Sequence, residues 1–370
     1  MEKAGGRWHP RNLNGWRRLG AFWLAVFSVI AIGSGVLQVL GPPGPALSSG
    51  ASAKLGVAGS QSANDHGTIV LAARPRPVPA AGAGRDTPGP VDDPDPALAE
   101  PAGDGSTQNL PRIALDGRAP MNVYAAGFDH SSRRPRVGLL LAGIGPDVAE
   151  SDAAIRNLPG AISLAVSPYA ANSTRLLATA RTAGHEYVVE IPLEPTGFPL
   201  NDPGPYTLLT GGSPAANADK LHWVLSRIDG YVGAAGVIGT MRGERLAAMT
   251  DQMDAVLAEL AARGLLYIDP REDHGGVSKA WGRHVDLVID DPADRDVADR
   301  AMIDAKLAAL EQLAKDTGSA LGLVMRPTPV AVARIAAWTN GLADRGLALA
   351  PVSALALPPP DGSAKLTERE

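Results

Sequence analysis

Between residues 135 and 357, short apolar runs alternate with amphipathic stretches, and this alternation restricts the possible folds most strongly. A strand–helix alternation at this spacing predicts right-handed βαβ units and therefore a parallel sheet. The apolar runs predict strands at 137–142, 161–166, 187–191, 234–238, 265–269, 285–289, 320–325 and 348–352. The amphipathic stretches predict helices at 172–183, 217–228, 245–263, 294–317 and 330–345.

Seven or eight such units in roughly 220 residues favour a distorted, closed or nearly closed parallel (β/α)7-8 barrel. An open, doubly wound sheet remains an alternative. The first predicted strand is followed by neither a G-x-G-x-x-G nor a Walker motif, so the sequence does not indicate nucleotide binding. The net charge of -5 does not suggest nucleic acid as a partner, and the lack of cysteine excludes disulfides and thiolate metal sites.

The N-terminal part predicts a membrane anchor. Residues 19–40 carry no charged side chain and are numerous enough to cross a bilayer. Residues 1–18 are basic, which predicts a cytoplasmic N-terminus and a folded domain on the periplasmic side of the inner (plasma) membrane. A cleaved signal peptide, with Ala51-Ser52-Ala53 as its cleavage site, is the alternative.

Two further segments are predicted to be disordered. Residues 41–134 are rich in Pro, Ala, Gly, Ser and Asp and almost lack aromatic residues, so they should act as a linker. The tail at 358–370 has the same character. The folded domain is therefore expected at 135–357.

A pair of carboxylates marks the predicted strand at 187–191. Glu190 lies at its end, Glu194 follows in a Pro-Leu-Glu-Pro run, and a long loop at 196–212 comes next. Long loops in compact domains are usually functional or disordered. In parallel barrels the active site lies at the carboxyl ends of the strands, where Asp269, Asp290 and Arg326 are also expected.

We therefore take Glu190, Glu194 and Asp269 as candidate catalytic residues, since carboxylates in unlike environments can divide acid and base roles. Such residues can equally cap a helix or form a salt bridge. Candidate substrate-binding residues lie at this same end of the barrel, which we call the mouth, where aromatic rings could stack on sugars. They are Tyr169, Phe198, Tyr206 and Arg326.

The histidines are weaker candidates. His185 and His284 precede strands and should lie at the opposite end of the barrel. His222 falls in a predicted helix and is expected to pack or to face solvent, whereas His274 could reach the mouth. No histidine pair has the spacing of a zinc motif.

Several ordered blocks resemble the divergent polysaccharide deacetylase family, a branch of the NodB-type carbohydrate esterases. The likeness spans about residues 135–357. The blocks are at 164–170, 183–186, 192–195, 201–209, 221–223, 230–233, 263–269, 337–338 and 351–355.

The resemblance implies a barrel of the glycoside hydrolase/deacetylase type that acts on an envelope polysaccharide or peptidoglycan. In the wider group, a divalent metal bound by an aspartate and two histidines polarises an N-acetyl carbonyl, and a second aspartate activates water. This chain departs from that pattern. Ala142-Gly143 occupies the position of the family's acidic pair, Glu190 occupies the position of a metal-binding histidine, and residues 238–243 contain no histidine. The metal is therefore left open, with either none or a hard divalent ion bound by carboxylates.

Two functions follow from these observations. The first is a membrane-anchored hydrolase of acetylated or amide-bearing glycans, which uses Glu190, Glu194 and Asp269. The second is a catalytically inactive module that binds a glycan or a partner protein.

Overall fold

The computed structural model describes residues 85–103, 108–171, 173–272, 277, 279–290 and 300–360. The predicted membrane anchor at 19–40, most of the predicted C-terminal tail and His274 lie outside these residues. In the part of the chain that is described, no helix is both long and apolar enough to span a bilayer.

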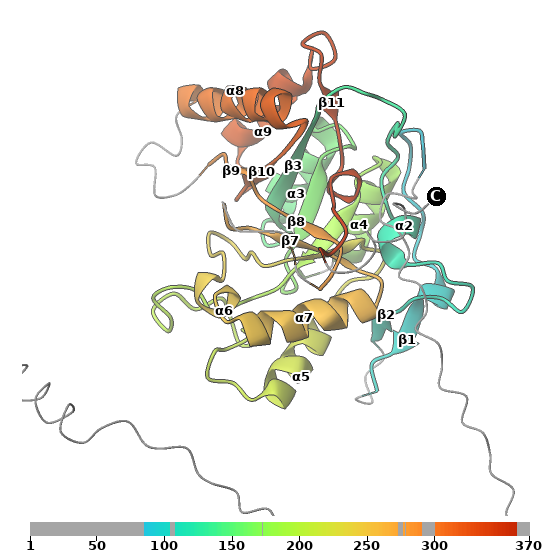
Figure 1. The fold of residues 1–370 in the computed structure, drawn as a ribbon, viewed down its shortest axis with the longest axis vertical. Coiled ribbons are helices and arrows are strands. Elements are labelled where there is room, and N and C mark those ends of the chain that lie inside the picture. Colours follow the sequence, from blue (N-terminus) through green and yellow to red (C-terminus); the bar gives the residue numbers. More distant parts are fainter. Residues whose placement is uncertain are drawn as a thin grey trace, which may run out of the picture. The chain divides into compact units, whose positions relative to one another are not determined.

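Parallel strands form the centre of the fold (Figure 1). In the described residues they make a nine-stranded sheet with the order β8-β7-β6-β5-β4-β3-β10-β9, and β11 pairs with β3 beside this path. Every pair in this sheet is parallel, as predicted. The strands are β3 (Arg136–Ile144), β4 (Ser163–Val166), β5 (Tyr187–Glu190), β6 (Gly233–Ala235), β7 (Leu266–Asp269), β8 (Gly282–His284), β9 (Leu287–Val288), β10 (Ser319–Val324) and β11 (Ala348–Leu349).

The two edges of this sheet meet in one short segment of chain. The edge strands β8 and β9 are separated only by Val285 and Asp286. The Val285 N–H donates to the Asp269 carbonyl of β7 at 2.8 Å, whereas the Asp286 N–H donates to the Leu321 carbonyl of β10 at 2.9 Å. The sheet is therefore strongly curled, which favours the barrel prediction over the open sheet. The strand predicted at 285–289 is in fact divided between both edges.

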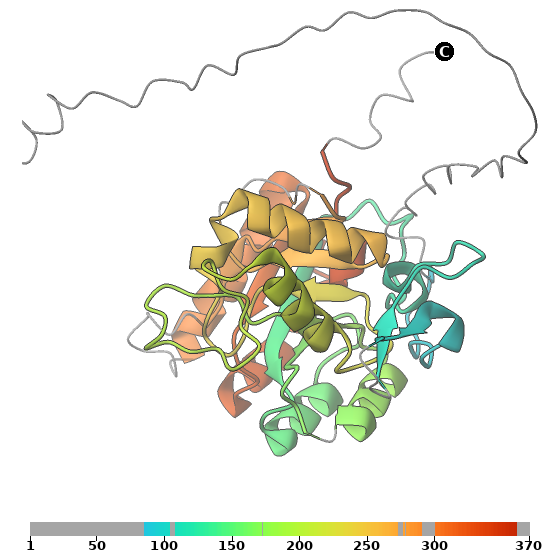
Figure 2. The same ribbon diagram turned by 90° about the horizontal axis from the view of Figure 1, so that it is seen from below.

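Helices connect the strands and flank the curled sheet (Figures 1 and 2). Ser213 and Thr328 cap α5 and α9 by accepting backbone N–H groups, and proline occupies the first helical position of each, as both sequences favour. Asp147 caps α3 in the same way. The helices are α3 (Val148–Asn157), α4 (Ser173–Thr182), α5 (Pro214–Leu225), α6 (Glu244–Ala247), α7 (Thr250–Ala262), α8 (Arg300–Thr317) and α9 (Pro329–Thr339).

Two helix predictions need correction. α3 was not predicted, because its buried side chains are only Ser151, Ala154 and Ile155, which give a weak apolar pattern. The helix predicted at 245–263 is divided into α6 and α7, and Met249 has an extended conformation between them.

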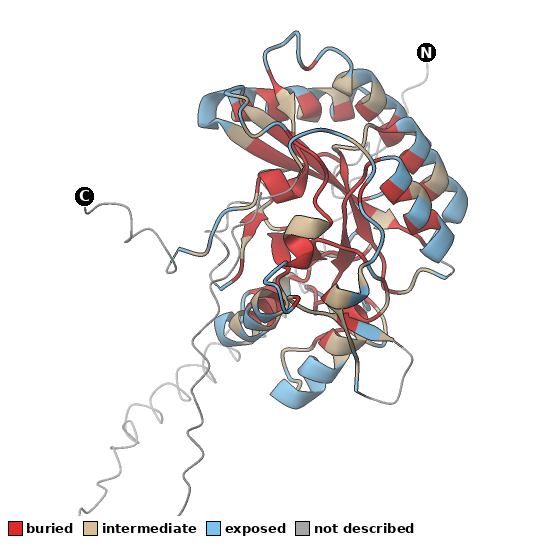
Figure 3. Cartoon of the chain, turned by 90° about the vertical axis from the view of Figure 1, so that its right-hand side faces the viewer, coloured by how far each residue is buried: buried red, intermediate tan, exposed pale blue. Residues whose placement is uncertain are grey.

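Buried residues are concentrated in the strands of the sheet (Figure 3). Alternation of side chains along β3 builds two layers of core. Leu139 and Leu141 face the layer that contains the helices, whereas Leu140 and Ala142 face the interior of the curled sheet. The interior layer also contains Leu321 from β10. Because both faces of each strand are buried, the strands read as continuous apolar runs, as the sequence shows.

The N-terminal strap, which we define as residues 85–103 and 108–134, is folded. It contains η1 (Pro96–Leu98), β1 (Ala99–Pro101), β2 (Asn109–Pro111) and α2 (Pro120–Val123). Leu98 and Met121 are buried in the interior core, and the Met121 N–H donates to the carbonyl of Gly264 just before β7.

The prediction of a disordered linker is therefore wrong for residues 85–103 and 108–134. The apolar residues of the strap have no helical or strand periodicity. They gain their burial by covering the N-terminal end of the curled sheet.

A buried carboxyl group, Glu186, joins three segments at that end. It accepts hydrogen bonds from the N–H of Ala126 in the strap (2.9 Å), from Ser163 Oγ of β4 (2.9 Å), and from the N–H (2.9 Å) and Oγ (2.6 Å) of Ser353. Ser353 belongs to η2 (Val352–Ala354). Burial raises the pKa of Glu186, and these hydrogen bonds oppose the rise.

The neighbouring His185 lies at this end of the sheet, as predicted. Its ring nitrogens lie 2.7 Å from the Ile162 carbonyl and 3.0 Å from the Ile155 carbonyl, and desolvation lowers its pKa.

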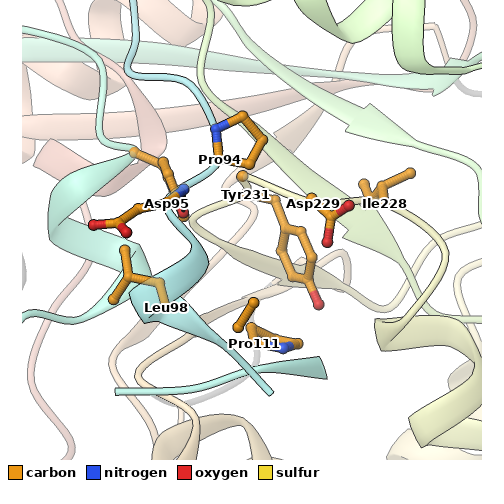
Figure 4. Close-up of a pocket in the computed structure, with 10 residues that line it drawn as sticks. Pro94, Asp95, Leu98, Pro111, Ile228, Asp229 and Tyr231 are labelled. Carbon is orange, nitrogen blue, oxygen red and sulfur yellow. Dashed lines mark hydrogen bonds between the residues drawn. The ribbon is translucent and has the colours of Figure 1, made fainter. Parts of the chain in front are cut away.

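A small pocket lies where the strap meets the start of β6 (Figure 4). Asp95 and Leu98 line it from the strap, and Asp229 and Tyr231 line it from the other side. Its volume of about 20 Å³ suits roughly one water molecule. The pocket is therefore not a substrate site.

We expect Glu186→Ala to lower the free energy of unfolding by about 3 kcal/mol or more, because it leaves several buried donors without an acceptor. Urea unfolding followed by circular dichroism measures this loss. The matched control is Glu150→Ala in the first turn of α3, which should change stability by less than about 1 kcal/mol. Equal losses in both variants would contradict the role of Glu186.

Candidate functional site

Glu190 occupies the centre of the candidate site. It is the last residue of β5, and its Oε1 atom accepts the N–H of Gly143 in β3 at 2.7 Å. β4 lies between these strands, so the side chain reaches across its end. The pairing of β3 with β4 shifts register between Leu141 and Ile144, and Gly143 has a φ of 74° there. This irregular backbone, which a glycine adopts easily, presents its N–H to Glu190.

The Glu190 carboxyl group is shielded from solvent. Its exposed fraction is 0%, and its Oε2 atom has no hydrogen-bond partner among the described residues. Burial raises the pKa of Glu190 to about 8, against a smaller lowering by the Gly143 hydrogen bond. At neutral pH the group is therefore mainly a neutral carboxylic acid.

Glu194 anchors the long loop. Its Oε2 atom accepts the N–H (2.6 Å) and the Oγ1 hydroxyl (2.9 Å) of Thr210, and its Oε1 atom lies 2.9 Å from Arg245 Nη1. The Glu194 N–H also donates to the Leu208 carbonyl at 3.0 Å. Its partners therefore give Glu194 a structural role.

Asp269 and Asp290 are also occupied. Asp269 forms a bidentate ion pair with Arg271, with Oδ1 at 2.9 Å from Nε and Oδ2 at 2.6 Å from Nη2. Asp290 accepts the backbone N–H groups of Met325 (2.6 Å) and Arg326 (3.2 Å) beyond β10. Burial raises the pKa of Asp290 to about 6, and these hydrogen bonds oppose the rise.

The residues that are present do not fit the divalent metal that the resemblance implies. The described part of the chain contains no group of three His, Asp or Glu side chains able to hold a metal ion. Glu194 and Asp269 each face an arginine, whose positive charge opposes a cation at the same carboxylate, and Glu190 is directed at the Gly143 N–H. Glu190, Glu194 and Asp269 therefore do not form the predicted oxygen-ligand site.

The predicted aromatic residues are partly brought together. Tyr206 stacks on Trp223 of α5 with a centroid distance of 3.4 Å, and Tyr169 lies tilted against Trp223 at 5.7 Å. Arg227 lies 4.8 Å from the Trp223 ring, and the hydroxyl of Tyr169 accepts the Tyr206 N–H at 3.3 Å. Much of this aromatic surface therefore holds the loop on α5.

Phe198 and Arg326 lie apart from this aromatic cluster. Phe198 is half-buried in the long loop, two residues before Leu200, which is 96% exposed. Arg326 is exposed just after β10, and its guanidinium has no ion pair among the described residues. Substrate binding by these residues, and by Tyr169 and Tyr206, stays a prediction.

Sequence reasoning missed the part that Trp223 and Arg245 play. Trp223 could have been noticed as an aromatic residue on the helix that follows the long loop. His222, beside it, lies 2.7 Å from Glu259 of α7, in agreement with the predicted packing or surface role.

The curled parallel sheet and its helices define a protein of the (β/α) type. At the carboxyl ends of its strands, the carboxyl groups of Glu190, Asp269 and Asp290 bond to other groups of the same chain. More specifically, the chain belongs to the divergent polysaccharide deacetylase family, whose model matches residues 139–356. The uncharacterized protein ATU2773 from Agrobacterium tumefaciens C58 is similar in structure. It is 31% identical, the match covers 67% of this chain and 99% of that one, and the TM-score is 0.61.

Two more distant structures have TM-scores that are too low to support a conclusion about function. The catalytic domain of peptidoglycan N-acetylglucosamine deacetylase from Eubacterium rectale ATCC 33656 has a TM-score of 0.37 at 12% identity, covering 59% of this chain and 88% of that one. A family 4 carbohydrate esterase from Streptomyces lividans has a TM-score of 0.36 at 16% identity, covering 62% and 100%. A comparison with curated proteins finds no match.

The raised pKa of Glu190 predicts a pH-dependent stability. The unfolded chain releases this proton near its ordinary pKa of 4.5, whereas the folded chain keeps it until about pH 8. Stability is therefore full below pH 4.5 and falls as the pH rises towards 8. Glu190→Gln removes this titration, so at pH 8 the variant should be more stable than the parent by on the order of a few kcal/mol.

Urea unfolding at several pH values measures this difference, and Glu150→Gln is the control. Because Asp290 adds a slope of the same sign, the comparison is between parent and variant. Parallel pH profiles for Glu190→Gln and the parent would contradict a neutral Glu190.

The anchoring role of Glu194 predicts a local effect in the long loop. Glu194→Ala should speed amide hydrogen exchange at Thr210 by at least about tenfold, because that N–H loses its acceptor. Arg245→Ala should act more weakly, since its side chain is 56% exposed and water screens the ion pair. Unchanged protection of Thr210 in Glu194→Ala would show that the loop is held elsewhere.

Proposed function

We propose that this protein acts in cell-envelope polysaccharide metabolism as a glycan-binding member of its family, without metal-dependent deacetylation. The observation that carries this proposal is the hydrogen bond between Glu190 and Gly143. It supplies a buried, mainly neutral carboxyl group where the resemblance expects a metal-binding histidine. The arginine partners of Glu194 and Asp269 support the same conclusion.

We further propose that the glycan-binding domain is held at the inner membrane. Residues 19–40 would form the anchor, and the arginines before them would keep residues 1–18 in the cytoplasm. Residues 41–84 would then serve as a tether on the periplasmic side. Such a tether lets a binding module reach glycan strands at some distance from its anchor.

A metal-independent hydrolase is the second candidate function. The raised pKa of Glu190 and its unpartnered Oε2 atom are properties of a general acid. Against this candidate, an exposed fraction of 0% keeps Glu190 out of reach of a substrate unless the long loop moves. The binding function is therefore the better supported of the two.

Two assays on the full chain in detergent test this proposal. We expect co-sedimentation with insoluble peptidoglycan or polysaccharide. We also expect no acetate release from N-acetylated chitooligosaccharides beyond that of Glu190→Gln. Acetate release that Glu190→Gln abolishes and Glu150→Gln preserves would favour the hydrolase. The absence of co-sedimentation would refute glycan binding.

A further inference from the structure

An open groove lies on the outer flank of the fold, between α3 and α4, away from the mouth. These two helices lie side by side (Figure 2). The groove is shallow and open, with a volume of about 770 Å³. Neither the candidate catalytic residues nor the aromatic cluster contributes to it.

Two arginines line this groove, and Asp152 lies close enough to interact with both of them. Arg156 and Arg175 line it, and no Asp or Glu is among its lining residues. The Arg175 guanidinium has no hydrogen bond or ion pair among the described residues. Arg156 is paired with Asp152 through Nε (2.7 Å) and Nη2 (3.1 Å). The net charge of the two arginines and Asp152 together is still positive, although the net charge of the whole chain is -5.

Hydroxyl groups accompany these arginines along α4. Thr179 Oγ1 donates to the Arg175 carbonyl at 3.1 Å, and Thr182 Oγ1 donates to the Ala178 carbonyl at 2.9 Å. Each hydroxyl oxygen can still accept a hydrogen bond from a ligand. At the end of the groove, Pro159 adds apolar surface.

The groove continues around the C-terminal end of α3. A second hollow of about 410 Å³ between α3 and α9 shares Arg156 and Pro159 with the first one, and adds Asn157, Thr339 and Asn340. The two hollows thus form a path that passes Arg156 and is lined by both polar and apolar side chains. A path of this kind suits a linear polymer better than a compact ligand.

We propose that this groove, which we name the flank groove, binds an anionic polysaccharide. The inference rests on the proposed glycan-binding function and names the class of glycan and its site. Arg156 and Arg175 would bind sugar carboxylates, since guanidinium groups match carboxylates in geometry and charge. The threonine and asparagine side chains would hydrogen-bond the sugar hydroxyls.

Charge also argues against a segment of this chain as the ligand of the groove. The proline-rich segment before the strap carries Arg74 and Arg76, which the groove arginines would repel. An anionic ligand gains from both arginines, whereas a neutral glycan uses only the hydroxyl and amide groups.

The test is affinity electrophoresis of the full chain in detergent with polygalacturonate, with dextran as the neutral glycan and polyglutamate as an acidic polypeptide. The test variant carries Arg156→Glu and Arg175→Glu together. Arg133→Glu and Arg134→Glu together, at two exposed arginines of the strap, are the matched control. Thermal unfolding of each variant verifies that it folds.

We expect the parent to bind polygalacturonate more tightly than dextran or polyglutamate. The Arg156→Glu/Arg175→Glu variant should lose at least about tenfold in affinity, and the strap control less than about twofold. Equal binding to dextran would refute the anionic class, and equal or tighter binding to polyglutamate would refute a glycan site. A folded Arg156→Glu/Arg175→Glu variant with unchanged affinity, or a larger loss in the strap control, would refute the flank groove as the site.

Co-sedimentation with peptidoglycan separates this inference from the function on which it rests. If the parent and the Arg156→Glu/Arg175→Glu variant sediment equally, the flank groove is refuted and glycan binding stands. If the parent binds neither polygalacturonate nor peptidoglycan, both proposals are refuted.

Discussion

The folded part of the chain depends on a buried carboxyl group at the N-terminal end of the curled sheet. Glu186 links β4, the strap and η2, which are far apart in the sequence, through hydrogen bonds of 2.6–2.9 Å. Glu186 acts together with apolar strap residues such as Leu98, Met121 and Phe128, which are buried in the interior core. If the strap left the sheet, this burial would be lost. The interior apolar layer would then face water.

At the opposite end of the sheet, carboxyl groups hold strands and loops in place. Glu190 joins β5 to β3, Glu194 holds the long loop, and Asp290 joins the chain after β9 to that after β10. A metal site needs several ionised ligands directed at one point, and these side chains are directed at different partners. These contacts make the strand ends and loops of the mouth rigid. Glycan binding is therefore more readily assigned to the flank groove.

Parallel strands were predictable because both faces of each are buried, which leaves continuous apolar runs such as 137–142. The strap was not predictable, since Leu98 and Met121 become buried only against distant strands. The sequence located Glu190 and Asp269 at strand ends correctly, and Glu194 in the loop after β5, because the carboxyl ends of parallel strands share one edge. It could not reveal their partners: Arg245 and Thr210 are far from Glu194 in the chain, and the Gly143 N–H depends on a register shift in β3.

The most direct test of a mouth without a catalytic metal is calorimetric titration of the full chain in detergent with Zn²⁺, Mn²⁺ and Mg²⁺. We expect no saturable binding, and heats that Glu190→Gln leaves unchanged. Saturable binding of one ion per chain that Glu190→Gln abolishes would contradict the neutral, hydrogen-bonded Glu190. It would restore a metal-assisted hydrolase as the function of this protein.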